Sequence, residues 1–166
     1  MENEQHEARW HIGSTEKEVH DLRREVAQTL GGWNLLLDAD LTFTFLLLVS
    51  ELATNAYRYG RCSMITVALV ATPGELFIDV MDGRNTSLPL RPRLRTSPRA
   101  ESGRGLQLVA AFANAWGEHR TRHGKGVWAT LSVPGAPEPP TLPTKRPSAV
   151  ASRYAHLPGL SVDVAT

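Results

Sequence analysis

The sequence is poor in several residue types, and each shortage excludes a class of protein. It has one cysteine in 166 residues, Cys62, so it can form no internal disulfide and has no cysteine cluster for a metal. Its 18 basic residues are balanced by 17 acidic ones, which gives no case for binding nucleic acid or an acidic membrane. The polar first ten residues are no signal segment, and the longest large-apolar run, Phe45 to Val49, cannot span a membrane. We therefore expect a cytoplasmic protein that binds neither nucleic acid nor membrane.

Proline is absent before Pro73, and its distribution divides the chain. Seven of the 11 prolines lie from Pro134 to Pro158, in a segment with few large apolar side chains. Such a segment cannot bury enough surface to offset the entropy lost on ordering, so residues 134–166 are predicted to be a disordered tail. Residues 8–133 would form one domain, preceded by a flexible N-terminus at 1–7.

A second irregular stretch lies between Gly83 and Ala100. It holds three prolines and five arginines but no acidic residue. Loops of this length without regular structure are uncommon inside a domain, and most of them are lids or binding loops. We interpret residues 83–102 as a lid, and the alternative is a solvated insertion without a role.

Apolar periodicity predicts the helices and strands in the rest of the chain. A capping box of Thr15 and Glu18 opens a first helix, which ends at Gly31 and Gly32. A second helix is predicted from about 41 to 59, and a third follows Gly105. Strands are expected at 9–12, 62–71, 75–81, 118–122 and 127–133, and the second and third of them are predicted to form a hairpin around a turn at Pro73 and Gly74. This order predicts an α/β (α+β) fold, in which helices cover one face of an antiparallel or mixed sheet.

The second predicted helix contains an isolated carboxylate. Glu51 is its only charged residue between Leu41 and Tyr57, and Asn55 lies one turn further on the same side. A carboxylate and an amide oxygen at the edge of a core can hold Mg²⁺ or position a nucleophile. The alternative is a structural one, with Glu51 paired to an arginine and Asn55 capping a neighbouring loop; the spacing does not decide between them.

Two glycine-containing motifs are further candidates. Asp82 and Gly83 end a predicted strand, where they would present a fixed acceptor beside accessible backbone, although Asp-Gly is also common in ordinary turns. The run from Ser102 to Leu106 precedes the third helix, and its glycines free backbone N–H groups to face an anion such as phosphate. Arg104 could add a bidentate contact. The alternative is a flexible loop before a helix.

Taken together, these motifs resemble the GHKL (Bergerat) ATP-binding fold of histidine kinase-like domains. The resemblance rests on Val49-Ser50-Glu51-Leu52-Ala53-Thr54-Asn55-Ala56, on Asp82-Gly83, on the run from Glu101 to Val109, and on Gly124-Lys125-Gly126-Val127-Trp128. Within the fold, the chain is most similar to bacterial anti-sigma regulatory factors, which are serine/threonine protein kinases. The resemblance implies a two-layer sandwich with ATP held between the helices and a lid.

The resemblance also implies a role for each candidate residue. Asn55 would coordinate Mg²⁺, Glu51 would be the general base, and Asp82, beside Gly83, would accept a hydrogen bond from the adenine amino group. The phosphates would lie along the loop and helix start formed by Gly103, Arg104, Gly105 and Leu106.

Two functions follow from these roles. The first is an ATP- and Mg²⁺-dependent kinase that phosphorylates a serine or threonine of an anti-sigma-factor antagonist. The second is a non-catalytic nucleotide-binding module that sequesters a sigma factor or an antagonist. It is suggested by Arg84, which stands where the family has a glycine. Related proteins suggest a homodimer.

Overall fold

The structure, a computed structural model, describes residues 5–35, 37–60, 63–83, 104–121 and 124–134. These ranges form β1 (His6–Gly13), α1 (Glu16–Gly32), α2 (Ala39–Tyr59), β2 (Met64–Thr72), β3 (Glu75–Asp82), α3 (Arg104–Phe112), β4 (Ala115–Thr121) and β5 (Gly124–Ser132). The predicted lid after Gly83, the candidate Gly103 and the predicted tail after Pro134 lie outside the described residues. In the described part of the chain, no helix combines the length and the apolar character needed to cross a membrane.

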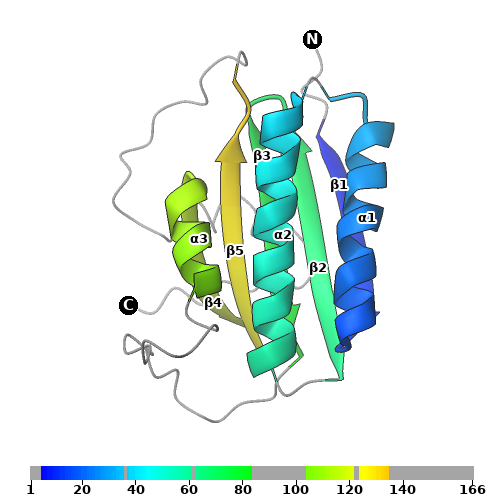
Figure 1. The fold of residues 1–166 in the computed structure, drawn as a ribbon, viewed down its shortest axis with the longest axis vertical. Helices are drawn as coiled ribbons and strands as arrows, with labels where there is room; N and C mark the ends of the chain where they lie inside the picture. Colours follow the sequence, from blue (N-terminus) through cyan, green and yellow to red (C-terminus); the bar gives the residue numbers. More distant parts are fainter. Residues whose placement is uncertain (1–4, 36, 61–62, 84–103, 122–123, 135–166) are drawn as a thin grey trace.

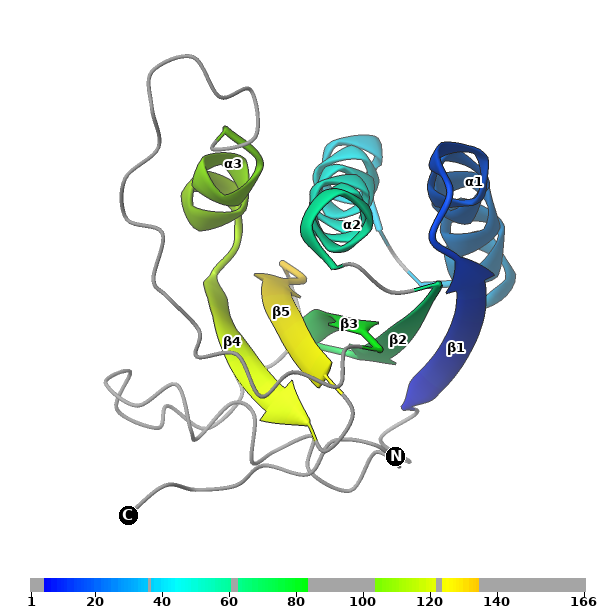
Figure 2. The same cartoon turned by 90° about the horizontal axis from the view of Figure 1, so that it is seen from below.

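The strands form one antiparallel sheet in the order β1-β2-β3-β5-β4. The predicted hairpin of β2 and β3 is present, with Thr72 opposite Glu75 at its closed end. The last strand, β5, lies between β3 and β4 rather than at the edge of the sheet (Figure 1). All three helices lie on the same face of the sheet (Figure 2). The structure thus confirms the predicted α+β sandwich and shows that the sheet is antiparallel rather than mixed.

Both long helices begin at capping residues. The Thr15 hydroxyl accepts a hydrogen bond from the Glu18 N–H at 3.3 Å and donates one to the Glu18 carboxylate at 3.0 Å. Asp38 caps α2, because its Oδ1 accepts the Leu41 N–H at 2.7 Å. These bonds satisfy helix-terminal N–H groups that have no partner within the helix. The predicted start of α1 is confirmed, and α2 begins two residues earlier than its periodicity indicated.

The main core lies between the sheet and the helices. The apolar stripe of α1, from Val19 to Leu30, is buried, and α2 buries one broad face that runs from Phe45 to Ala56. Fully burying one large aliphatic side chain stabilises a fold by about 1.5–3 kcal/mol. From the sheet, the core takes alternate residues of β2, β3 and β5: Ile65, Val67, Leu69, Ala71, Leu76, Ile78, Val80, Val127, Ala129 and Leu131.

The other residues of these strands point to the opposite face of the sheet, which we call the second face. Val70, Phe77 and Trp128 form a separate apolar cluster there. The rings of Phe77 and Trp128 are stacked, with their centroids 6.3 Å apart. The molecule therefore has two buried layers, although its helices lie on only one side of the sheet.

The strand boundaries depart from the prediction where glycines pack under large rings. β4 begins at Ala115 and β5 at Gly124, each three residues before its predicted start. Gly117 lies under Trp128, since a Cβ at this position would stand 2.9 Å from the Trp128 Cζ2. These contacts between strands outweigh the low strand propensity of glycine. The first strand is also longer than predicted, because β1 begins at His6.

Candidate functional site

Glu51 and Asn55 lie one turn apart on α2, at the edge of the main core. Both residues are half-buried, next to the buried Leu52 and Ala53. The apolar residues of α2 occupy the core, so the two polar side chains are left at its border. Among the described residues, Glu51 takes part in no ion pair. The arginine pairing considered as the structural alternative is therefore not observed with any arginine that the structure describes.

The start of α3 lies against Glu51. A Cβ added at Gly105 would stand 2.6 Å from the Glu51 Oε2 atom, so no side chain fits at position 105 unless the carboxylate moves. The first N–H groups of a helix lack partners within the helix, and the helix dipole makes this end attractive to anions. The contact thus brings together two motifs that are more than fifty residues apart in the sequence.

Asp82 ends β3 beside the end of α2. Its carboxyl Oδ1 accepts the Lys125 N–H of β5 at 3.0 Å, and the side chain is only 9% exposed. A Cβ at Gly60, the residue that caps α2, would lie 2.9 Å from the Asp82 Cβ. The bond to β5 fixes the carboxylate, and a carboxylate that accepts one hydrogen bond can still accept others. Asp82 is therefore held in place as an oriented acceptor.

Gly83 and the residues at the start of α3 differ in the space around them and in their exposure. Gly83 is exposed, and its added Cβ would meet only the Met64 carbonyl, at an ordinary contact distance of 3.5 Å. Position 83 would accept a side chain without any rearrangement, whereas position 105 would accept one only if the Glu51 carboxylate moved. Arg104 is exposed at the first position of α3. Leu106 is half-buried against the main core, so its side chain anchors the helix.

The comparison with protein families settles the class of this domain. The model of a family described as "Histidine kinase-like ATPase domain" matches residues 13–132, well over half of the chain. The chain belongs to this family. No curated protein matches the sequence. The matched residues of the ATPase domain include α2, the end of β3 and the start of α3. The domain is thus of an ATP-binding type, and the geometry above describes its candidate nucleotide site.

The side chains of this ATPase domain fit a magnesium ion carried by a nucleotide. Glu51 and Asn55 offer a carboxylate and an amide oxygen, which are ligands that Mg²⁺ accepts. In nucleotide sites, Mg²⁺ uses one or two protein ligands and completes its shell with phosphate oxygens and water. Within the described ranges, no group of three or more His, Cys, Asp or Glu side chains could hold a metal. The ion would thus be bound together with the phosphates.

Sequence analysis missed a buried polar pair on the second face of the ATPase domain. His119 of β4 places its Nε2 2.8 Å from both carboxyl oxygens of Asp79 on β3. The side chains are 6% and 0% exposed, respectively. Burial raises the pKa of Asp79 above its usual value, and the hydrogen bond from His119 opposes that rise. The polar residues around His119 in the sequence predict a surface position for it, and the structure shows that this prediction is wrong.

Gly126 makes the pairing of Asp79 and His119 geometrically feasible. It lies on β5, between the two strands that carry the pair, and its Cα faces that of His119. A Cβ at Gly126 would stand 2.1 Å from the His119 Nε2, so the imidazole crosses β5 only because no side chain is there. One signal could have found Asp79: like Glu51, it is a lone acidic residue in an apolar run, Leu76 to Met81.

Proposed function

We propose that this domain is an ATP- and Mg²⁺-dependent protein kinase of the anti-sigma type. It would transfer the γ-phosphate of ATP to a serine or threonine of a partner regulatory protein, an anti-sigma-factor antagonist. The observation that supports this proposal best is the contact of Gly105 with the Glu51 carboxylate. It places Glu51, the only charged residue between Leu41 and Tyr57, beside a helix start that is suited to phosphates.

Each residue has a part in the proposed reaction. Asn55 would hold Mg²⁺, which when bound offsets the charge of the phosphates. Asp82, already oriented by the Lys125 N–H, would accept a hydrogen bond from the adenine amino group. The N–H groups at the start of α3, at Arg104, Gly105 and Leu106, would bind phosphate oxygens. In the sequence, Gly103 precedes them and would extend the same anion-binding stretch.

The chemical step is a transfer between two oxygens. Glu51 would accept the proton of the attacking hydroxyl on a carboxyl oxygen as that hydroxyl bonds to the γ-phosphorus. The bond from the γ-phosphorus to the bridging oxygen would break, and ADP would leave with the bond electrons. Such transfers need mainly positioning and charge stabilisation. A carboxylate beside a helix start fits this requirement.

Calorimetric titration with ATP and Mg²⁺ tests the nucleotide site. The unaltered protein should bind, and Asn55→Ala should weaken Mg²⁺-dependent binding by at least about 10-fold, since it removes a metal ligand. Gln107→Ala, an exposed change on α3, is the matched control and should bind normally. An unaltered protein that binds no nucleotide at millimolar concentration would exclude the site and the kinase together.

Phosphotransfer separates the kinase from the alternative, a non-catalytic module that sequesters a sigma factor or an antagonist. With labelled ATP and a candidate antagonist, Glu51→Gln should lower transfer by about 10²–10⁴-fold, as expected for the loss of a general base. Glu25→Gln, an exposed change on α1, should transfer normally. ATP binding without any transfer would favour the sequestering module, which Arg84 already suggests. Full transfer by Glu51→Gln would exclude Glu51 as the base.

A further inference from the structure

Phe43 is exposed on the outer side of α2. It is 61% exposed, whereas Phe45 and Leu48 of the same helix are fully buried. Leu47 follows Phe43 one turn later on the same side and is half-buried. A single exposed apolar residue is ordinary on a protein surface, so Phe43 indicates a binding site only together with other features.

Arg23 of α1 extends over Phe43 and is fixed there. The two helices lie side by side on the sheet (Figure 1, Figure 2). The guanidinium carbon of Arg23 lies 5.7 Å from the centre of the Phe43 ring, and its Nη1 donates a hydrogen bond to the Ser50 Oγ at 3.1 Å. The Ser50 hydroxyl donates in turn to the Leu46 carbonyl at 2.8 Å, so its oxygen is left to accept from Arg23. Because these contacts restrict its rotamers, Arg23 is a pre-oriented cation.

Arg23 takes part in no ion pair among the residues that the structure describes. Residues 42–50 of α2 carry no charge, and Glu51 lies against the start of α3 instead. A guanidinium has five N–H donors, of which the bond to Ser50 uses one. The remaining donors match the two oxygens of a carboxylate. On α1, the residues one turn away from Arg23 are not acidic: Val19, His20, Val26 and Ala27.

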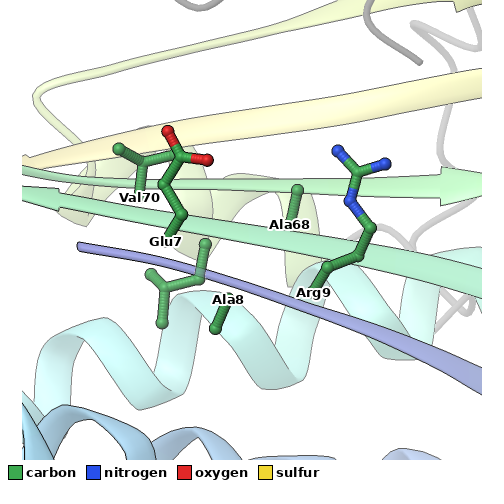
Figure 3. Close-up of a pocket in the computed structure, with 6 residues that line it drawn as sticks. Glu7, Ala8, Arg9, Ala68 and Val70 are labelled. Carbon is green, nitrogen blue, oxygen red and sulfur yellow. The ribbon is translucent and has the colours of Figure 1, made fainter. Parts of the chain in front are cut away.

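The hollow on the second face has a different charge balance. It has a volume of about 150 Å³ between β1 and β2, and Glu7 and Arg9 line it with opposite charges (Figure 3). Because the two charges offset each other, the hollow favours no ligand of one sign. The outer side of α1 and α2, in contrast, has an unbalanced positive charge beside an apolar ring. We call its four residues the outer strip: Arg23, Phe43, Leu47 and Ser50.

The outer strip has residue types that are typical of protein interfaces. Aromatic side chains and arginine are enriched at the centres of interfaces, and arginine is common among the residues that dominate binding energy. Phe43 offers an apolar contact, and Arg23 offers paired donors beside it. A complementary surface therefore has a large apolar side chain next to a carboxylate. An amphipathic helix presents such a pair when the two residues are three or four positions apart.

We propose that the outer strip binds an amphipathic helix of a partner protein, in which an Asp or Glu lies one turn from a large apolar residue. The carboxylate pairs with the Arg23 guanidinium, and the apolar side chain covers the Phe43 ring. Such a helix is a means of holding the regulatory protein that the proposed function requires. The outer strip borders α1, whereas the candidate nucleotide site lies toward α3, so this binding requires neither nucleotide nor phosphotransfer.

Selection from a displayed peptide library tests the outer strip without a known partner. The immobilised full chain should enrich peptides with an acidic residue three or four positions from a large apolar one. Synthetic versions of these peptides should bind Arg23→Gln and Phe43→Ala at least about 10-fold more weakly than the unaltered chain. Two exposed changes outside the outer strip are the matched controls and should bind normally: Arg24→Gln on α1 and Phe112→Ala on α3.

Three results of the selection would overturn the proposal. They are a library that enriches nothing, peptides without the acidic and apolar pair, and peptides that bind the Arg23→Gln and Phe43→Ala variants as tightly as the unaltered chain. Circular dichroism verifies that each variant is folded. Because Phe43 is exposed, Phe43→Ala should retain the fold and decides the outcome if Arg23→Gln does not.

Amide chemical shifts locate the bound peptide on the domain. In the isotope-labelled chain, an enriched peptide should change most strongly the signals of residues 20–27 of α1 and 43–54 of α2. The signals of residues 7–9 and 68–70, which line the hollow on the second face, should stay unchanged. The largest changes at this hollow or on α3 would overturn the proposal. Neither experiment uses nucleotide, so a failure of peptide binding is distinguishable from a failure of the proposed kinase activity.

Discussion

The helix side and the second face of the sheet each contain a carboxylate within an apolar segment, but the two carboxylates differ in burial and in bonding partners. Glu51 is half-buried on α2, against the backbone of Gly105, and forms no ion pair among the described residues. Asp79 is fully buried on β3 and bonded to His119. The first carboxylate lies beside a helix start, whereas the second is bonded to a side-chain partner. An isolated acidic residue in an apolar run thus marks either a site or a structural pair.

Removing His119 should have the largest effect on stability. His119→Ala leaves the Asp79 carboxyl buried without its partner, and breaking a buried pair in this way costs about 3–5 kcal/mol. Urea denaturation measures the loss, and His20→Ala, on the exposed side of α1, is the control. Nucleotide binding should persist wherever the variant is folded. A loss below 1 kcal/mol would contradict the structural role of the pair.

Gly126→Ala sharpens this prediction through a double-mutant cycle. The added methyl group would meet the His119 ring, so the single variant should lose about 1–3 kcal/mol through overpacking and displacement of the imidazole. In a His119→Ala background the same change should cost much less, since the ring it meets is gone. Costs that simply add would show that Gly126 serves some other purpose.

On the helix side, Gly105→Ala should act on the site more than on the fold. Its Cβ would push the Glu51 carboxylate out of position, so we expect weaker nucleotide binding or transfer, with little loss of stability because the carboxylate is the movable end of a flexible side chain. Gly31→Ala is the matched control, because a Cβ at that position meets nothing within 4 Å. Because Gly31 lies in the last turn of α1, this control should be neutral or slightly stabilising. Equal behaviour of the two variants would refute the contact.

The smallest predicted effect is a pH dependence of stability that comes from Asp79 on the second face. The pKa of Asp79 is raised in the folded protein from its usual 3.8, so the folded state binds this proton more tightly than the unfolded chain. Protonation therefore stabilises the fold fully below pH 3.8, and this gain is lost as the pH rises through the raised pKa.

Asp79→Asn removes this dependence and retains an acceptor for the His119 ring. The stability of the unaltered protein relative to the variant should therefore fall as the pH rises above 3.8 and through the raised pKa of Asp79. Urea denaturation at a series of pH values gives this difference. Glu51→Gln serves as the comparison from the helix side. A difference for Asp79→Asn that stays constant or rises with pH would contradict the direction of the shift.

Much of the fold could be predicted because its signals are local. The capping residues Thr15 and Asp38 and the apolar stripe of α1 lie within a few residues of the structure that they determine. The hairpin of β2 and β3 follows from two apolar runs around Pro73 and Gly74. The starts of β4 and β5 could not be predicted, because Gly117 belongs to a strand only through its contact with Trp128.

In the candidate site, too, some features follow from local sequence and others only from tertiary structure. The sequence by itself determined that α2 carries Glu51 and Asn55 on one side, since helical spacing brings residues i and i+4 together. It also determined that Asp82 would end a strand, because the apolar run stops there. What those residues face was decided only by tertiary structure.

The placement of β5 between β3 and β4, and of α3 against α2, joins residues that are distant in the chain. It brings Gly105 to Glu51, and it lets His119 reach Asp79 across Gly126. Gly105 and Gly126 permit these contacts because they have no side chain that would collide with Glu51 or His119. A missing side chain contributes nothing to the apolar pattern of the sequence, so the two contacts could not be predicted from it. The sequence thus named Glu51 as a candidate, and the packing of the strands and helices decided what Glu51 and Asp79 each face.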